Sequence, residues 1–330
     1  MSIMPPSCGI ALCTYNGARF LAAQLDSIKR QTCPIAEMVI HDDGSSDGSW
    51  ELLEQWAAQA PFPVHLQRHG RQLGAAKNFE TALAALHTDL IFLCDQDDVW
   101  MPDKLQRLCD RFAAEQDLML IHTNAILLDA NGVAMKRTLF DALELQATEK
   151  NFINNGQAHT ALRRRNLVTG ATTAFRRRLL DHALPFPTHV LHDEWLGVVA
   201  CMMGKLALLP EPTMFYRQHE GNLVGAPRRY RFKSLKNFLW HIRQPDSRAP
   251  LRRRFSYQQQ VQARALRAAR GNRSLLVSIR QTHDFAGFRC SLPSQVWRRA
   301  SMLYRHWRAG HYHQFTDTPW TDLLRDLIQR

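Results

Sequence analysis

The first 130 residues alternate short apolar runs of strand length with longer segments whose apolar residues recur at helical spacing. This alternation predicts an α/β fold with a mostly parallel central sheet flanked by helices, because neighbouring parallel strands need a long crossover between them. The predicted strands are Cys8 to Thr14, Glu37 to His41, Val64 to Gln67, Leu90 to Cys94 and Leu118 to Thr123.

Four apolar stripes at helical spacing mark helices that we expect to bury one face. The stripes are Leu21, Leu25 and Ile28; Phe79, Ala82, Leu83 and Leu86; Leu105, Leu108 and Phe112; and Trp195, Val198, Val199 and Met202. We expect Pro102 in the first turn of the third helix. The fourth helix is predicted to run from near His192 to a left-handed cap at Gly204.

Residues 130–165 lose this regularity and are predicted to form a long irregular connection, which in a compact domain is often functional or mobile. The run Arg163-Arg164-Arg165 ends it. The next segment, RNLVTGATTAF (165–175), predicts a strand. Gly170 within it either permits close approach of a substrate to the backbone or marks a bulge in an ordinary buried strand.

The composition excludes several classes of protein. The chain has 330 residues, of which 45% are hydrophobic, enough for a sizeable core. Its seven cysteines are scattered without zinc-like spacing, which predicts buried thiols in a reducing compartment. No apolar run approaches the length of a membrane span, and the N-terminus lacks the pattern of a signal peptide. We therefore expect a cytoplasmic protein rather than a secreted disulfide scaffold, an integral membrane protein or a disordered chain.

Positive charge is concentrated at the C-terminal end. Residues 226–330 hold 22 Lys and Arg against 5 Asp, whereas residues 1–225 hold 20 basic and 25 acidic residues. We therefore predict a catalytic domain over 1–225 and a basic, mainly helical region over 226–330. Two apolar stripes predict helices in the basic region; they are Val296, Ala300, Leu303 and Trp307, and Trp320, Leu323, Leu324, Leu327 and Ile328.

Carboxylates gather after two predicted strands, where open α/β sheets place their ligands. The first cluster is HDDGSSDG (41–48), which taken alone favours a turn stabilised by Asp side chains. The second is CDQDDVW (94–100), in which Asp95, Asp97 and Asp98 would repel one another unless a cation lies among them. Hard oxygen ligands favour Mg²⁺ or Mn²⁺.

Two common nucleotide-binding motifs are absent. The sequence has no P-loop, and no G-x-G-x-x-G follows the first strand, which argues against P-loop nucleotidases and dinucleotide oxidoreductases. A metal held by one or two carboxylates can instead bind a diphosphate and neutralise it as a leaving group.

Seven further segments follow one another along the chain. They are CTYNGARFLAAQLDSIKRQT (13–32), IHDDGSSDGS (40–49), GAAKNFETAL (74–83), FLCDQDDVWMPDKL (92–105), NLVTGATTAF (166–175), HDEWLGVVA (192–200) and YRQHEGNLVG (216–225). In this unbroken order they resemble family 2 glycosyltransferases with the GT-A fold, and among them bacterial rhamnosyltransferase-type enzymes of surface-polysaccharide synthesis.

The resemblance implies a binding site for a nucleotide-sugar donor and a divalent metal. It places Thr14, Tyr15 and Asn16 at the donor's nucleobase and ribose, with Asp43 and Asp42 at the pyrimidine. Asp95-Gln96-Asp97 corresponds to the family's D-x-D motif. Asp97 is then the direct ligand of Mn²⁺ or Mg²⁺, and Asp95 lies nearer the ribose or sugar.

The resemblance also implies an inverting transfer with Asp193 as general base, although a common alternative for Asp193 is the N-cap of the following helix. Where the family has Glu before this aspartate, the chain has His192, so the roles of His192 and Glu194 stay open. Gly170 would belong to the acceptor side. His219 would contact the diphosphate or the metal.

The region corresponding to the Q-x-x-R-W motif of processive synthases reads Tyr216-Arg217-Gln218-His219, which favours transfer of single sugars. The expected donor is dTDP-L-rhamnose, with a UDP-hexose as the alternative. The expected acceptor is a saccharide or lipid-linked saccharide of O-antigen, lipopolysaccharide or capsule synthesis.

The basic region allows further interpretations. Its Trp, Tyr and Arg residues are typical of a helix on an anionic membrane, such as the inner membrane face. Alternatively, its apolar stripes pack on the catalytic domain and its arginines are solvated. A nucleic-acid binder would leave the acidic motifs unexplained. A nucleotidyltransferase would need a glycine-rich basic loop where this chain has only Asn16-Gly17-Ala18-Arg19.

Overall fold

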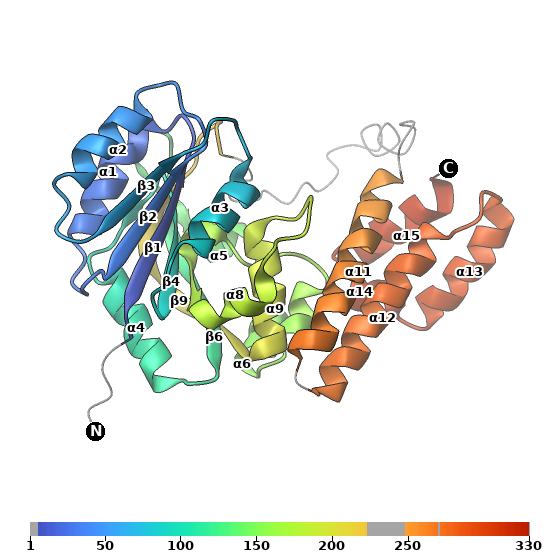
Figure 1. The fold of residues 1–330 in the computed structure, drawn as a ribbon. Helices are drawn as coiled ribbons and strands as arrows, with labels where there is room; N and C mark the ends of the chain where they lie inside the picture. Colours follow the sequence, from blue (N-terminus) through green and yellow to red (C-terminus); the bar gives the residue numbers. More distant parts are fainter. Residues whose placement is uncertain (1–5, 223–247, 270, 330) are drawn as a thin grey trace. The chain divides into compact units, whose positions relative to one another are not determined.

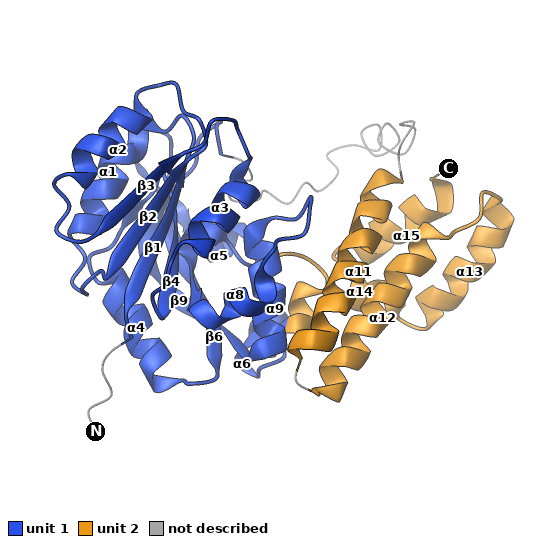
Figure 2. Cartoon of the chain, viewed as in Figure 1, with its two compact units in different colours: residues 1–158, 168–227 blue, residues 159–167, 228–330 orange. Residues whose placement is uncertain are grey.

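The computed structural model describes residues 6–222, 248–269 and 271–329, and the chain divides into two compact units (Figure 2). The first comprises residues 1–158 and 168–227, and the second comprises 159–167 and 228–330. The boundary expected between 225 and 226 lies outside the described residues. The segment 159–167, which the sequence placed in the first domain, groups with the C-terminal helices.

The first unit begins with the predicted alternation of strands and helices (Figure 1). The strands are β1 (Cys8–Thr14), β2 (Glu37–Asp42), β3 (Val64–Arg68) and β4 (Leu90–Asp95). The helices between them are α1 (Ala18–Lys29), α2 (Ser49–Ala57) and α3 (Ala75–Ala84). β1 has the predicted bounds, and β2, β3 and β4 each extend one residue further.

The rest of this unit departs more from prediction. α4 (Lys104–Ala114) and β6 (Leu118–Leu128) were expected, although β6 continues beyond Thr123. The connection predicted to be irregular instead contains β7 (Ala134–Thr138), α5 (Leu139–Ala142), α6 (Ala147–Asn154) and α7 (Ala158–Leu162). That prediction was wrong because elements this short carry little periodicity.

Three further differences concern the segments around the sheet. Neither β5 (Val99–Trp100) nor β9 (Lys205–Arg217) was predicted from the sequence. The strand expected over 165–175 is confined to β8 (Thr173–Arg176), preceded by the 3₁₀ turn η1 (Gly170–Thr172). A second 3₁₀ turn, η2 (Arg177–Leu179), and α8 (Leu180–Ala183) follow.

One mixed sheet runs through the unit in the order β3-β2-β1-β4-β8-β6-β9-β5, with β7 paired to β6. The first four strands are parallel, whereas β8 is antiparallel to both of its neighbours. Because β1 pairs with β2 on one side and with β4 on the other, the strand order reverses at β1. Ligands of open α/β sheets bind at such a reversal, outside the carboxyl ends of the strands.

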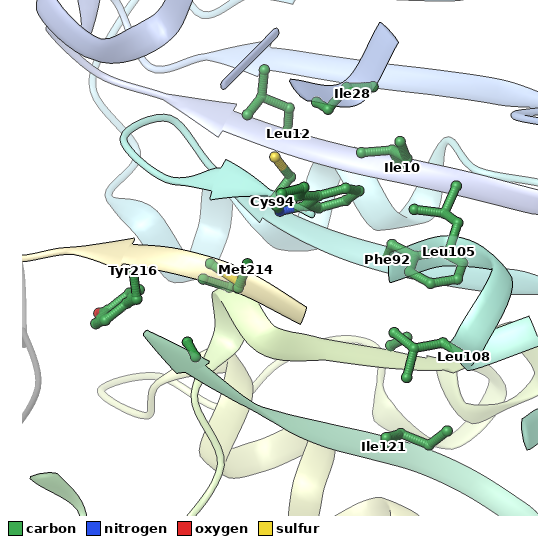
Figure 3. Packing of buried hydrophobic residues seen from close by; sticks show 14 of the residues in the cluster. Ile10, Leu12, Ile28, Phe92, Cys94, Leu105, Leu108, Ile121, Met214 and Tyr216 are labelled. Atoms are coloured by element: carbon green, nitrogen blue, oxygen red, sulfur yellow. The ribbon is translucent and has the colours of Figure 1, made fainter. Parts of the chain in front are cut away.

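The main core lies on one face of the sheet. Alternate strand residues such as Ile10, Leu12 and Phe92 pack with Ile28 of α1 and Leu105 of α4 (Figure 3). All three residues of the first predicted stripe and all three of the third are fully buried, as expected. The opposite face of β1 and β2 is covered by α3.

α9 (His192–Met203) confirms the fourth predicted helix, and its four stripe residues are buried. Gly204 ends it, but with a φ of 172° its backbone is extended rather than left-handed. Glycine is needed there for space, because a Cβ would lie 2.4 Å from the carbonyl oxygen of Asp117. Pro102 precedes α4 instead of lying in its first turn, because the helix begins at Lys104.

The second unit consists mainly of α11 (Ala249–Ala268), α12 (Arg273–Cys290), α13 (Val296–Arg308), α14 (His311–Phe315) and α15 (Pro319–Ile328). It has its own core around Phe285, Leu303 and Tyr312. The predicted stripes were wrong in part, since Val296 and Trp320 are exposed. None of the described helices is long and apolar enough to cross a membrane.

Candidate active site

Three predicted site residues lie side by side at the carboxyl ends of neighbouring strands. Thr14 ends β1 and pairs in register with Asp42, the last residue of β2. Asp95 ends β4 and is in register with Cys13. The hydroxyl of Thr14 donates to Asp42 Oδ2 over 2.9 Å. The parallel register therefore brings Thr14 and Asp95 close to Asp42, although they are 28 and 53 positions away from it in the sequence.

The loop after β1 is held by side chains from two other loops. Tyr15 donates its backbone N–H to Gln96 Oε1 at 2.8 Å, and Gln96 Nε2 donates back to the Tyr15 carbonyl at 3.0 Å. Asn16, at a φ of 48°, donates its N–H to Ser45 Oγ at 2.8 Å. The Tyr15 ring is 43% exposed, so the loop leaves an aromatic face open to solvent at this edge of the sheet.

Asp42 and Asp43 are buried and hold the surrounding loops. Asp42 Oδ1 accepts from the backbone N–H of Ser45 at 2.8 Å, as expected for a turn stabilised by aspartate. The two oxygens of Asp43 accept from the N–H groups of Leu73 and Gly74 at 2.7 and 2.9 Å. Each oxygen of Asp43 accepts one of these bonds and keeps a second acceptor position for a ligand. Both oxygens of Asp42 already accept two bonds each, from Gly44, Ser45 and Thr14, so Asp42 mainly holds the loop.

The loop after β4 and the end of β9 form one polar network. Arg217 donates its N–H to Asp98 Oδ1 at 3.0 Å and its Nε–H to the Asp97 carbonyl at 2.9 Å. Beyond it, His219 Nε2 lies 2.7 Å from Asp97 Oδ2, and Asn222 Nδ2 donates to the same oxygen at 3.2 Å. The Oδ2 atom of Asp97 is thus contacted by both the imidazole of His219 and the side-chain amide of Asn222.

Asp193 lies in the first turn of α9, two residues after the N-cap Leu191, so it is not the N-cap itself. Its Oδ1 accepts from the Glu194 N–H at 2.6 Å, and its Oδ2 accepts from the Gly170 N–H at 3.1 Å. These donors and the positive end of the helix stabilise its negative charge. Gly170 therefore lies in the 3₁₀ turn and contacts the candidate base directly.

The carboxylates converge on one place. The pKa of Asp95 is raised to about 7, first by removal from water and then by the charges of Asp97 and Asp193. The pKa of Tyr216 on β9 is raised by burial and by the charges of Asp98, Asp95, Asp97 and Asp193. Residues from β4, α9 and β9 therefore share one electrostatic environment, and Tyr216 was not predicted from the sequence.

His192 is buried beneath this site. Its ring stacks on Phe79 with centroids 4.2 Å apart, and neither ring nitrogen has a hydrogen-bond partner. Burial lowers the pKa of His192 to about 4, so the ring is neutral near pH 7. A Cβ at Gly170 would lie 2.6 Å from His192 Nε2, so residue 170 must be glycine for this ring to fit.

Lys104, which the sequence analysis missed, is a fully buried cation near the acidic loop. Its Nζ donates to the Ala171 carbonyl at 2.9 Å and lies 4.0 Å from the centre of the Trp100 ring. Burial lowers the pKa of Lys104 to about 8, while Cys94, Asp98 and Asp95 oppose that shift. The sequence could have indicated this burial, because Lys104 lies four residues before Leu108 and therefore on the same buried face of α4.

The donor set suits a hard divalent cation. Asp98 Oδ2 is buried without a hydrogen-bond partner, Asp95 and Asp97 are close to it in sequence, and His219 Nε2 lies 2.7 Å from Asp97 Oδ2. Carboxylate oxygens are the kind of ligand that fits Mn²⁺ or Mg²⁺. Elsewhere in the described part of the chain, the sulfur atoms of Cys8, Cys33 and Cys109 lie within 4.8 Å of one another. Cys8 is the first residue of β1, so this cluster lies at the opposite end of that strand.

Comparison with known proteins identifies the family. Residues 10–184 match the model for glycosyl transferase family 2. The chain belongs to this family. Its first unit has the GT-A-like fold of this family.

Two curated relatives share between a quarter and a third of their residues with the aligned part of this chain. An uncharacterized glycosyltransferase of Nostoc sp. is 28% identical over 221 residues, which cover 64% of this chain and 65% of the relative, slightly less than two thirds. The dTDP-rhamnosyl transferase RfbG of Shigella flexneri is 27% identical over 226 residues, covering 65% and 74%.

Two solved structures share the fold. S. aureus TarS 1–349 in complex with UDP-GlcNAc has a TM-score of 0.55 at 14% identity, covering 90% of this chain and 80% of that fragment. The mannosyltransferase PcManGT from Pyrobaculum calidifontis, in complex with GDP-Man and Mn²⁺, has a TM-score of 0.50 at 21% identity, covering 98% and 85%.

Proposed function

We propose that this glycosyltransferase moves a single sugar, with inversion, from a pyrimidine nucleoside diphosphate donor to an acceptor hydroxyl, and that it requires a divalent metal. The main support is the convergence of Asp95, Asp97, Asp98 and Asp193, whose charges act together on Tyr216. One carboxylate group on the leaving-group side and one base on the acceptor side meet the needs of an inverting transfer.

Asp97 and His219 hold the metal in this proposal, and Asp95 lies nearer the ribose or sugar. The 2.7 Å distance between Asp97 Oδ2 and His219 Nε2 supports a shared ligand position. When bound, Mn²⁺ or Mg²⁺ neutralises charge on the departing diphosphate. Asn222 donates to Asp97 Oδ2 and orients that carboxylate.

Asp193 acts as the general base. Its carboxylate takes the proton of the acceptor hydroxyl while the acceptor oxygen bonds to the anomeric carbon and the bond to the diphosphate breaks. The N–H groups of Gly170 and Glu194 hold the carboxylate in one orientation. His192 packs against Gly170 and thereby holds the turn that carries it. The Glu194 side chain contacts the acceptor in this proposal.

Thr14, Tyr15 and Asn16 receive the nucleobase and ribose, with Asp43 and Asp42 at the pyrimidine. The exposed Tyr15 ring supports stacking on a base. We propose dTDP-L-rhamnose as donor, supported by the 27% identity to the dTDP-rhamnosyl transferase RfbG. A UDP-hexose is the alternative, since TarS, which shares the fold, was solved with UDP-GlcNAc. The acceptor is a saccharide or lipid-linked saccharide of O-antigen, lipopolysaccharide or capsule synthesis.

We further propose that the enzyme is cytoplasmic and contacts the inner membrane face through α13. Trp297 and Tyr304 are 69% and 62% exposed, and their spacing of seven residues places them on one side of the helix. Arg298 lies over the Trp297 ring at 4.9 Å. Exposed aromatic rings beside arginines favour an anionic bilayer surface.

The donor site is tested by thermal stabilisation with UDP, dTDP and GDP, each with and without Mn²⁺. We expect one pyrimidine diphosphate to raise the Tm in a Mn²⁺-dependent way, because a ligand that binds only the folded state stabilises it. Asp97→Asn should abolish the shift, whereas the control Asp103→Asn, on an exposed residue, should keep it. A shift that Asp97→Asn leaves intact contradicts the metal assignment.

The membrane contact is tested by sedimentation with vesicles of phosphatidylcholine alone or with phosphatidylglycerol. Binding should require phosphatidylglycerol and weaken in Trp297→Ser, but not in the control Trp56→Ser, which tests a buried tryptophan of the first unit. Equal binding to duplex DNA, abolished by salt, would instead favour the nucleic-acid interpretation of the basic region.

A further inference from the structure

A cavity of about 270 Å³ lies wholly within the second unit. It is lined by residues from the segment 159–167 and from α11, α12 and α15, together with the chain between α14 and α15. With a liquid-water share of about 30 Å³ per molecule, its volume corresponds to about nine waters, which is near the lower end of small-ligand sites. The cavity is thus large enough for a diphosphate and part of a group attached to it.

The lining carries more positive than negative charge. Five arginines face two aspartates in it; the arginines are Arg163, Arg164, Arg254, Arg289 and Arg325. Both aspartates already have partners. Asp322 pairs with Arg289 at 3.0 Å and with Arg325 at 3.1 Å, and Asp317 pairs with Arg165 at 3.4 Å. Outside the lining, Arg289 also pairs with Asp326 at 2.6 Å. These three carboxylates are still fewer than the arginines around them, so the described part of the unit keeps an excess of positive charge at the cavity.

The excess of positive charge acts on Arg163, whose guanidinium group is only partly hydrogen-bonded. Its NH1 donates to Ser278 Oγ at 3.1 Å, but its buried Nε has no hydrogen-bond partner. Burial lowers the pKa of Arg163 to about 10, and the neighbouring charge of Arg164 lowers it further in the same direction. The pKa of the nearby His159 is lowered to about 4 by burial and then by the charges of Arg163 and Arg254. The local potential is therefore positive.

A second polar group in the lining also lacks a partner. Gln258 is 3% exposed, and its Oε1 makes no hydrogen bond. A buried amide oxygen without a donor is costly, so a hydroxyl or protonated phosphate on a ligand would relieve it. One part of the remaining wall is apolar and includes Leu251, Phe285 and Phe315, and the other part consists of three threonines.

We propose that this cavity binds a phosphate or diphosphate ester, with the arginines on the phosphate and the apolar wall on the esterified group. Guanidinium groups suit phosphate because they donate several hydrogen bonds in a fixed plane. The ester is either a soluble phosphorylated compound or the diphosphate headgroup of a lipid. This site is separate from the proposed donor site and does not depend on it.

The proposal is tested by calorimetric titration of the full chain with inorganic pyrophosphate and with farnesyl diphosphate in nonionic micelles. The buffer contains a chelator, so that metal-dependent binding at the acidic site does not contribute. Arg163→Gln should weaken binding by about tenfold or more, as expected for a lost charged hydrogen bond. The control Arg280→Gln removes the same charge from a side chain of α12 that is 77% exposed, and should change affinity less than about twofold.

Arg325→Gln is a second lining variant, which keeps the test valid if Arg163→Gln fails to fold. Tighter binding of farnesyl diphosphate than of pyrophosphate identifies a lipid headgroup, and equal binding identifies a soluble ester. Either result supports the site, provided the lining variants bind more weakly than Arg280→Gln. The proposal is wrong if neither compound binds, or if Arg280→Gln weakens binding as much as the lining variants do.

Discussion

The two units contain opposite charge excesses. At the sheet edge of the first unit, Asp95, Asp97 and Asp98 lie together and Lys104 is the buried cation whose charge acts on two of them. In the second unit, Asp317 and Asp322 only partly neutralise the arginines around the cavity. An uncompensated buried charge is destabilising, so the charge excess in each unit fits a ligand of opposite sign.

The units also differ in how the charged groups are brought together. The carboxylates of the first unit follow directly after strands, so the sheet alone aligns most of them. The arginines of the second unit come from separate helices and from a segment that interrupts the first unit in sequence.

The largest effect should come from Asp193→Asn. Because the variant loses the base but keeps the shape and the N–H partners of the side chain, we expect turnover to fall by about 10²–10⁴-fold. Mn²⁺-dependent nucleotide binding should stay within about twofold, as measured by Tm shift. Lost nucleotide binding with retained turnover would place Asp193 in the donor site instead.

Lys104→Met should lower the free energy of unfolding by about 3 kcal/mol, because it leaves the buried carboxylates without their cation. Urea denaturation measures the effect, and the exposed Lys136→Met is the control. Adding Asp98→Asn to Lys104→Met should restore part of the stability, since the pKa of Asp98 is raised by burial and by Asp97 and Asp95. Simple additivity of the two substitutions would show that Lys104 acts by packing alone.

The third prediction concerns pH and the second unit. The pKa of His159 falls from 6.5 to about 4 on folding, so between these values the unfolded state binds more protons and stability decreases as the pH is lowered. Between pH 7 and 5 this contribution is about 2 kcal/mol. His159→Gln should remove that part of the pH dependence in urea denaturation. An unchanged profile would mean that the histidine is not held neutral by burial and the arginines.

The smallest effect is expected for Thr14→Val, which removes the 2.9 Å hydrogen bond from Thr14 to Asp42. A loss of about 1 kcal/mol is expected for a buried hydrogen bond of this kind. Urea denaturation and the nucleotide-dependent Tm shift should be measured together. A full loss of nucleotide binding without loss of stability would show direct contact of the hydroxyl with the ligand.

The local pattern predicted the elements that carry strong periodicity. β1 and the stripes of α1, α3, α4 and α9 appear as expected. The short elements between 134 and 162 were missed, because four to eight residues contain at most two turns of a helix. The outward position of Val296 and Trp320 was also missed, because spacing alone does not show that Arg299 and Asp322 occupy the buried positions.

By itself, the sequence determined which residues stand at the ends of strands, because apolar runs and the polar residues that follow them are local properties of the chain. It thereby placed Asp42 and Asp95 in carboxylate clusters that follow strands, and the family resemblance added Thr14 at the end of the first strand. The sheet register then made these three residues neighbours. Only the tertiary structure decided that His219 contacts Asp97 across 122 residues, that Lys104 is buried near the acidic loop, and that residues 159–167 join the C-terminal helices. These contacts depend on packing between distant segments, which no local pattern specifies.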